Sequence, residues 1–152
     1  MAQLFDALEA LDVLVSCATD PAPASIEATT PEALIAALDA RVYGSYWAAK
    51  HALPKMRAGG NIVFFSSGVP RQSRPDTSAQ SMIDGAVEAL TRALAVEAGA
   101  QGVRVNCVAS GPAGADGPAA DSVIETVMFL AQATHLTGAV IDVNESSAGL
   151  YA

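Results

Sequence analysis

Three polar residues carry side chains of the kinds that acid–base chemistry uses: Arg41, Ser67 and Asp84. An aspartate can serve as a general base, an arginine can clamp an anionic group, and a serine hydroxyl can polarise a carbonyl by donating a hydrogen bond. A structural interpretation competes with this one, and it is the one we favour. Arg41 and Asp84 would then form an ion pair, because burying either charge alone is unfavourable, and Ser67 would cap backbone groups at the end of a strand.

The other candidate residues are interpreted as structural. His51 lies inside a predicted helix without a nucleophile and carboxylate beside it, and His135 ends a helix, where a cation suits the helix dipole. Tyr43, Tyr46 and Trp47 have near-helical spacing and are predicted to be core or interface residues. The histidines, cysteines and carboxylates nowhere have the spacing of metal ligands, so we expect no metal site.

Apolar periodicity predicts helices that alternate with short buried strands, which is typical of βαβ units and a parallel sheet. Thr30 can cap a long helix that has Pro31 at its first position, and Gly59 and Gly60 are expected to end that helix. The predicted helices cover residues 4–11, 31–56, 80–98 and 118–133, and the predicted strands cover residues 12–17, 61–66, 103–109 and 139–144. The sequence therefore predicts one α/β domain over residues 1–152.

Five segments of the chain carry a resemblance to a known family. Residues 84–111 read DGAVEALTRALAVEAGAQGVRVNCVASG, and the other segments, in chain order, are LDVLVSCAT, ARVYGSYWAAKHALPKM, GGNIVFFSSG and LTGAVIDVN. In this order and at this spacing they resemble the C-terminal part of short-chain dehydrogenases/reductases, whose active-site helix begins Y-x-x-x-K. The resemblance implies the second half of a Rossmann-type doubly wound sheet, with about four parallel strands and flanking helices.

Measured against that family, the chain departs from the pattern at the functional positions. The proton-donating tyrosine falls on Gln80, the ribose-holding lysine on Asp84 and the catalytic asparagine on Arg41, whereas the catalytic serine is kept as Ser67. Neither glutamine nor aspartate can replace the tyrosine and lysine in hydride-transfer chemistry. The resemblance therefore predicts that this chain binds no nicotinamide cofactor and is not a self-sufficient NAD(P)-dependent dehydrogenase.

Further departures lie in the loops and in the missing first half. Ser16 and Cys17 replace two asparagines of the family, Ser110 and Gly111 replace its Pro-Gly pair, and residues 143–146 replace its closing VDGG. The glycine-rich phosphate loop and its half-domain have no counterpart here, so we expect an N-terminally truncated relative whose strand 12–17 is an exposed edge.

Composition and charge exclude several other classes of function. The net charge of −8 argues against nucleic acid and anionic membrane surfaces, both of which require basic patches. No segment has the apolar length of a membrane span, and the first residues do not resemble a signal peptide. Cys17 and Cys107 lie in apolar runs and are predicted to be buried, reduced thiols, which indicates a cytoplasmic protein.

Three functions stay open on the sequence. The first, which we favour, is a non-catalytic subunit that forms homo-oligomers or pairs with an active relative through the apolar helix 80–98 and the exposed edge strand. The second is a lyase, isomerase or cyclase. Its small-molecule substrate would bind where the family binds its own substrate, against Arg41, Ser67, Gln80 and Asp84. The third is an NAD(P)H-dependent oxidoreductase that requires a separate nucleotide-binding chain.

Overall fold

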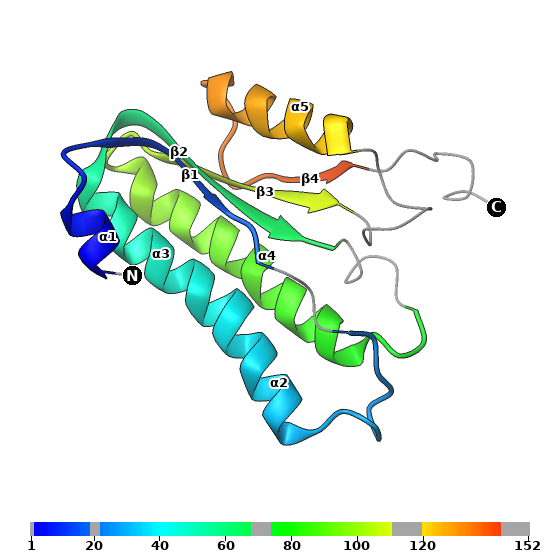
Figure 1. The fold of residues 1–152 in the computed structure, drawn as a ribbon. Helices are drawn as coiled ribbons and strands as arrows, with labels where there is room; N and C mark the ends of the chain where they lie inside the picture. Colours follow the sequence, from blue (N-terminus) through cyan, green and yellow to red (C-terminus); the bar gives the residue numbers. More distant parts are fainter. Residues whose placement is uncertain (1, 19–21, 68–73, 111–119, 144–152) are drawn as a thin grey trace.

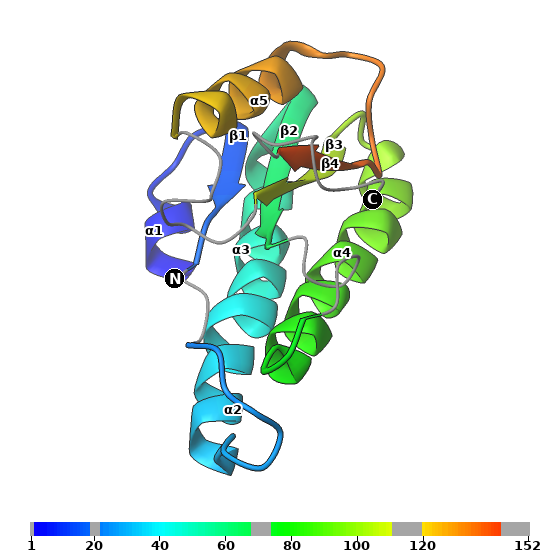
Figure 2. The same ribbon diagram turned by 90° about the vertical axis from the view of Figure 1, so that its right-hand side faces the viewer.

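The computed structural model describes residues 2–18, 22–67, 74–110 and 120–143, which form three layers with a sheet in the middle (Figure 1). In the views of Figures 1 and 2, α5 covers one face of the sheet, and α3 and α4 lie side by side on the other. In chain order the elements are α1 (Ala2–Asp6), β1 (Leu11–Ser16), α2 (Pro31–Leu38), η1 (Asp39–Tyr43), α3 (Gly44–Ala52), η2 (Leu53–Lys55), β2 (Met56–Ser66), α4 (Ser78–Gly99), β3 (Arg104–Ser110), α5 (Ala120–Gln132) and β4 (Val140–Val143).

The sheet has four parallel strands in the order β1-β2-β3-β4. Each strand pairs with the next one along the chain, so every connection is a crossover that places its helix on a face of the sheet. This confirms the predicted fold class. The predicted strand at residues 12–17 is also an edge strand, and Val13 and Val15 of β1 are 37% and 44% exposed.

Side chains alternate along the central strands and divide the core in two. Ile62 and Phe64 of β2 pack toward α4, together with Val105 and Cys107 of β3. The residues between them face α5, where the buried cluster is Val63, Val108, Leu130 and Val143. Both faces of β2 and β3 are therefore buried, as their continuous apolar runs indicate.

The predicted long helix is present but differs in its interior and at its end. Thr30 caps α2, and its side chain accepts a hydrogen bond from the Ala33 N–H at 3.2 Å. A π-helical turn, η1, joins α2 to α3, and the helix ends in the short 3-10 turn η2. The prediction that Gly59 and Gly60 end the helix was wrong, because both lie inside β2. Gly59 has a φ of +91°, a conformation that favours glycine, and its N–H donates to the Gly102 carbonyl at 2.8 Å.

The two cysteines lie in different environments. Cys107 is buried on β3, as predicted, but Cys17 is exposed, so the prediction for Cys17 was wrong. The reason is that β1 ends at Ser16, so that Cys17 follows the strand, and that β1 pairs with a neighbour on one side only among the described strands. In the described parts of the chain no helix is long and apolar enough to cross a membrane.

Candidate functional site

Arg41 lies in the π-helical turn between α2 and α3, and its side chain points into the protein, where it is only 4% exposed. A π turn changes the phase of a helix and is frequently found at functional positions. The Arg41 guanidinium donates through Nη2 to Asp84 Oδ1 at 2.5 Å and to the Phe65 carbonyl at 3.1 Å. The sequence-based expectation that Arg41 and Asp84 form a buried ion pair is confirmed.

Asp84 is the centre of this cluster. It lies on α4, is completely buried, and uses both carboxylate oxygens. Oδ1 accepts from Arg41, and Oδ2 accepts from the Ser67 N–H at 3.2 Å and also from the Ser67 hydroxyl. The three residues come from the α2–α3 helix, the end of β2 and α4, so the network ties these elements together at the carboxyl end of the strand. We call Arg41, Ser67 and Asp84 the charge network.

A second buried carboxylate, Glu88, lies one helical turn after Asp84 and was missed on the sequence. It is 6% exposed and accepts a hydrogen bond from the Ser66 hydroxyl at 2.9 Å. Its signal in the sequence is helical spacing, because Asp84 and Glu88 are four residues apart on the same face as the buried Val87. Burial raises the pKa of the nearby Cys107 thiol to about 11, and the Glu88 carboxylate adds to this rise.

Gln80, at the position of the family's tyrosine, is not part of the charge network. It lies in the first turn of α4 and is 7% exposed, and among the described residues no hydrogen bond joins its side chain to Arg41, Ser67 or Asp84. The structure therefore brings three of the four predicted pocket residues together and leaves the fourth apart.

Other predicted positions are placed as follows. The Ser16 hydroxyl, which replaces a family asparagine, lies 3.2 Å from the Ser45 hydroxyl on α3. Ser110 ends β3, whereas Gly111 and residues 144–146 lie outside the described residues.

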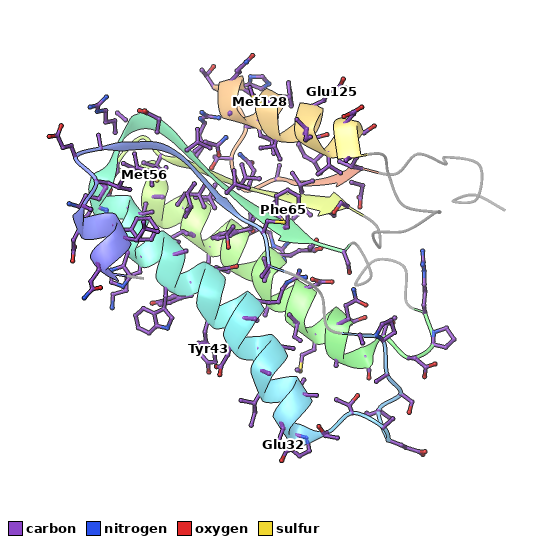
Figure 3. All side chains as sticks on the ribbon, viewed as in Figure 1. Glu32, Tyr43, Met56, Phe65, Glu125 and Met128 are labelled. Carbon is purple, nitrogen blue, oxygen red and sulfur yellow. The ribbon has the colours of Figure 1, made fainter. Side chains whose placement is uncertain are left out.

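The histidine of α3 and the aromatic residues of η1 and α3 are not members of the charge network. His51 stacks on Phe5 with 6.2 Å between ring centroids, and Lys50 lies 4.6 Å from the centroid of the Trp47 ring. Tyr43, Tyr46 and Trp47 are about half exposed, so they are not core residues; an interface role stays a prediction. Figure 3 labels Tyr43 on the side of the helix away from the sheet. No cluster of three possible metal ligands occurs among the residues with described positions.

The residues at the family's catalytic positions do not fit a nicotinamide cofactor. The resemblance implies that the family's ribose-holding lysine stands at the position of Asp84, but the side chain here is a carboxylate that is 0% exposed and already bound to Arg41 and Ser67. Reaching a ribose would require breaking a buried ion pair, which is strongly unfavourable. The amide of Gln80 does not titrate and cannot act as the proton donor.

Comparison with known proteins supports the family resemblance. The family described as enoyl-(acyl carrier protein) reductase matches residues 1–148. Glucose and ribitol dehydrogenase homolog 2 of Arabidopsis thaliana is 31% identical over 102 residues, which cover 67% of this chain and 35% of the plant protein. L-fucose dehydrogenase of Mus musculus is 36% identical over 103 residues, covering 66% of this chain and 38% of the mouse protein. The matches thus span less than two fifths of the length of these curated relatives.

Solved structures extend the match to nearly all of the chain. The crystal structure of a small-chain dehydrogenase aligns with a TM-score of 0.85 and 28% identity, covering 96% of this chain and 74% of that one. The landomycin C-6 ketoreductase LanV, solved with bound NADP and rabelomycin, aligns with a TM-score of 0.81 and 28% identity, covering 93% and 67%. Since the fold, the order of the motifs and the family match over residues 1–148 agree, the chain belongs to the short-chain dehydrogenase/reductase superfamily.

Proposed function

We propose that this chain is a non-catalytic member of its superfamily, a subunit that assembles with a second copy or with an active relative and does not transfer hydride. The observation that carries the proposal is the charge network. It occupies the positions at which the family places its asparagine, serine and lysine, and each of its three side chains bonds to another member.

The chemistry of the network supports loss of the hydride-transfer reaction. Ser67 would have to donate its hydroxyl hydrogen to a substrate carbonyl, but that hydrogen is directed to Asp84. Gln80 supplies no titrating group where a proton donor is needed. The same geometry speaks against Asp84 as a general base in a lyase, isomerase or cyclase, because a carboxylate without exposed surface does not meet a substrate.

The outer surface of α3 and α4 supports an assembly. A groove of about 450 Å³ lies between these helices, and Tyr46, Leu53, Leu90 and Leu94 are among its lining residues. On the same helix as Leu90, Met82 is half exposed, and β1 lies at the edge of the sheet that the described residues form. Apolar grooves and open strand edges of this kind are typically covered by another chain. In the family that the chain resembles, these two helices pack against their copies in a second subunit.

Native mass spectrometry together with light scattering tests the assembly. We expect the wild-type chain to form a dimer or a larger complex at micromolar concentration, and we expect Leu90→Glu to weaken it, because an anchor near an interface centre typically contributes about 2 kcal/mol or more. Val96→Glu is the matched control: Val96 is 81% exposed on the same helix but does not line the groove. A folded wild-type monomer without any co-purifying chain would contradict the proposal.

The alternative is an NAD(P)H-dependent oxidoreductase completed by a separate nucleotide-binding chain. The names of the relatives favour it, since they are dehydrogenases and a ketoreductase. It predicts that nicotinamide cofactor binds to the co-purified complex and that this complex oxidises the cofactor, whereas the proposal predicts that the chain adds neither property to its partner.

A further inference from the structure

A small cavity lies apart from the charge network, near the amino-terminal ends of α2 and α4. It measures about 220 Å³ and is bounded by the segment 22–30, by α2, and by Asp76, Ala79 and Gln80 at the start of α4. Its walls are built largely of small apolar residues, six of which are alanines. Figure 1 shows α2 and the beginning of α4 at the same end of the molecule.

Gln80 is the distinctive residue of this wall. Its side chain is more than nine-tenths buried, yet no hydrogen bond to it is formed by any residue in the described ranges. By contrast, the buried Arg41, Ser67, Asp84 and Glu88 side chains are all hydrogen-bonded. The amide atoms of Gln80 nevertheless keep accessible surface, because among the described residues Asn61 Oδ1 is the fully buried side-chain atom without a hydrogen-bond partner. An amide that is largely enclosed, lines a cavity and stays accessible can donate to and accept from a ligand in that cavity.

We propose that this cavity binds a small neutral molecule that carries a carboxamide or lactam group and that Gln80 recognises it. The glutamine amide presents N–H donors and a carbonyl acceptor in one plane, which pair with the acceptor and donor of a second amide. The exposed Asp76 carboxylate beside the cavity and the net charge of −8 disfavour an anion. The cavity volume corresponds to about seven water molecules, so the ligand has about six to eight non-hydrogen atoms.

The proposal is independent of hydride transfer and of the assembly, because none of the residues that it uses belongs to the charge network or to the groove between α3 and α4. It adds a binding site for a ligand of defined chemistry, with Gln80 as its recognition residue.

Two-dimensional ¹H–¹⁵N NMR of the full chain tests the site with isobutyramide as the probe and isobutyrate as its anionic counterpart. We expect saturable shifts of the Gln80 side-chain amide and of the Ala33 and Ala79 backbone amides at millimolar isobutyramide, the affinity range of so small a molecule. Isobutyrate should produce no such shifts. Gln80→Met, which keeps the length but removes both hydrogen-bonding groups, should weaken binding about tenfold, since one lost pair is worth about 1.4 kcal/mol.

Gln132→Met, an exposed glutamine on α5, is the matched control and should bind isobutyramide like the wild type. Ala37→Leu fills the cavity without touching the amide chemistry and should abolish the shifts, so it decides the question if Gln80→Met fails to fold. Equal binding by Gln80→Met and wild type would overturn the proposal. The absence of saturable shifts in the wild type, with the Gln80 amide hydrogen-bonded to ordered water alone in a crystal, would overturn it as well.

Discussion

The two faces of the sheet bury polar side chains in different ways. On the α4 face, two pairs of polar side chains bond to each other, Arg41 with Asp84 and Ser66 with Glu88, and bonds to backbone carbonyls are added by Arg41 and Thr91. On the α5 face, they bond to backbone. Arg104 donates to the Gly59 and Ala131 carbonyls at 3.0 and 3.2 Å and to two further carbonyls at the end of α5.

The asparagines of the α5 face follow the same rule. Asn61 donates to the Leu130 carbonyl, while Asn106 donates to the Leu136 carbonyl at 3.1 Å and accepts from the Ala139 N–H at 3.2 Å. Exchanging a side-chain pair for an apolar pair removes a donor and its acceptor together, so that only the bonds of the pair to third groups are lost, whereas a backbone carbonyl stays in place when its donor is removed. We therefore expect the α4 face to tolerate paired replacement better than the α5 face.

The largest expected effect comes from removing one charge on the α4 face. Asp84→Asn keeps the shape of the side chain but leaves Arg41 without its counter-charge, which is expected to lower the free energy of unfolding by about 3–5 kcal/mol. Urea denaturation measures this loss. Asp12→Asn, at an exposed aspartate of β1, is the control and should be nearly neutral. Equal stability of both variants would contradict a buried, paired Asp84.

The double replacement sharpens the same contrast. Arg41→Met with Asp84→Met removes both charges and should recover part of the stability lost in Asp84→Asn, since apolar replacement of a buried pair is often neutral or stabilising. Recovery should be incomplete, because the Phe65 carbonyl and the Ser67 N–H each lose a hydrogen bond. If the double variant were as unstable as the single variant, the network would contribute more than charge compensation, and the comparison between the faces would fail.

On the α5 face the expected effect is smaller but not recoverable. Arg104→Met removes the donors to carbonyls at the end of α5, and Arg104 is partly exposed, so water can replace some of them. We expect a loss of about 2 kcal/mol in the free energy of unfolding. Arg104→Lys should recover only part of it, because one ammonium group cannot reproduce the fork of a guanidinium. Full recovery by lysine would show that charge, not geometry, holds this end of the helix.

The smallest expected effect concerns the thiols. With its pKa raised from 9.0 to about 11, Cys107 stays protonated at pH 8 and should resist iodoacetamide in the folded protein, whereas the exposed Cys17 should react. Below pH 9 the Cys107 thiol is protonated in both the folded and the unfolded state, so it does not change the free energy of unfolding. Between pH 9 and about 11 the unfolded state loses its proton first, so stability declines as pH rises. Peptide mapping after alkylation measures the difference, and rapid modification of Cys107 in the native protein would contradict its burial.

Much of the fold could be predicted because strands that are buried on both faces of a parallel sheet have continuous apolar sequences. The helix start predicted at Thr30 and Pro31 is observed, and the strand predicted at residues 103–109 is shifted by one residue. The strand predicted at residues 61–66 is the second half of the longer strand β2. Gly59 and Gly60 were misassigned because glycine is common both at helix ends and in irregular strands. The hydrogen bond from the Gly59 N–H to the Gly102 carbonyl, which the local sequence does not reveal, holds this segment in the extended conformation.

Within the site, opposite charge predicted the pairing of Arg41 with Asp84, because one buried charge requires another. Local sequence does not determine how a helix is rotated against a sheet. That rotation buries Glu88 and keeps the Gln80 side chain out of the charge network, although Gln80 and Asp84 are one helical turn apart.

We propose that Arg41, Ser67 and Asp84, at the positions that the resemblance assigns to catalysis, form a closed charge network that does not accept a nicotinamide cofactor. Calorimetric titration of the purified chain with NADPH, and separately with NADH, tests it most directly. We predict no saturable heat of binding for either cofactor, because Asp84 stays bound to Arg41 and Ser67. A micromolar dissociation constant for NADPH or NADH would contradict the account.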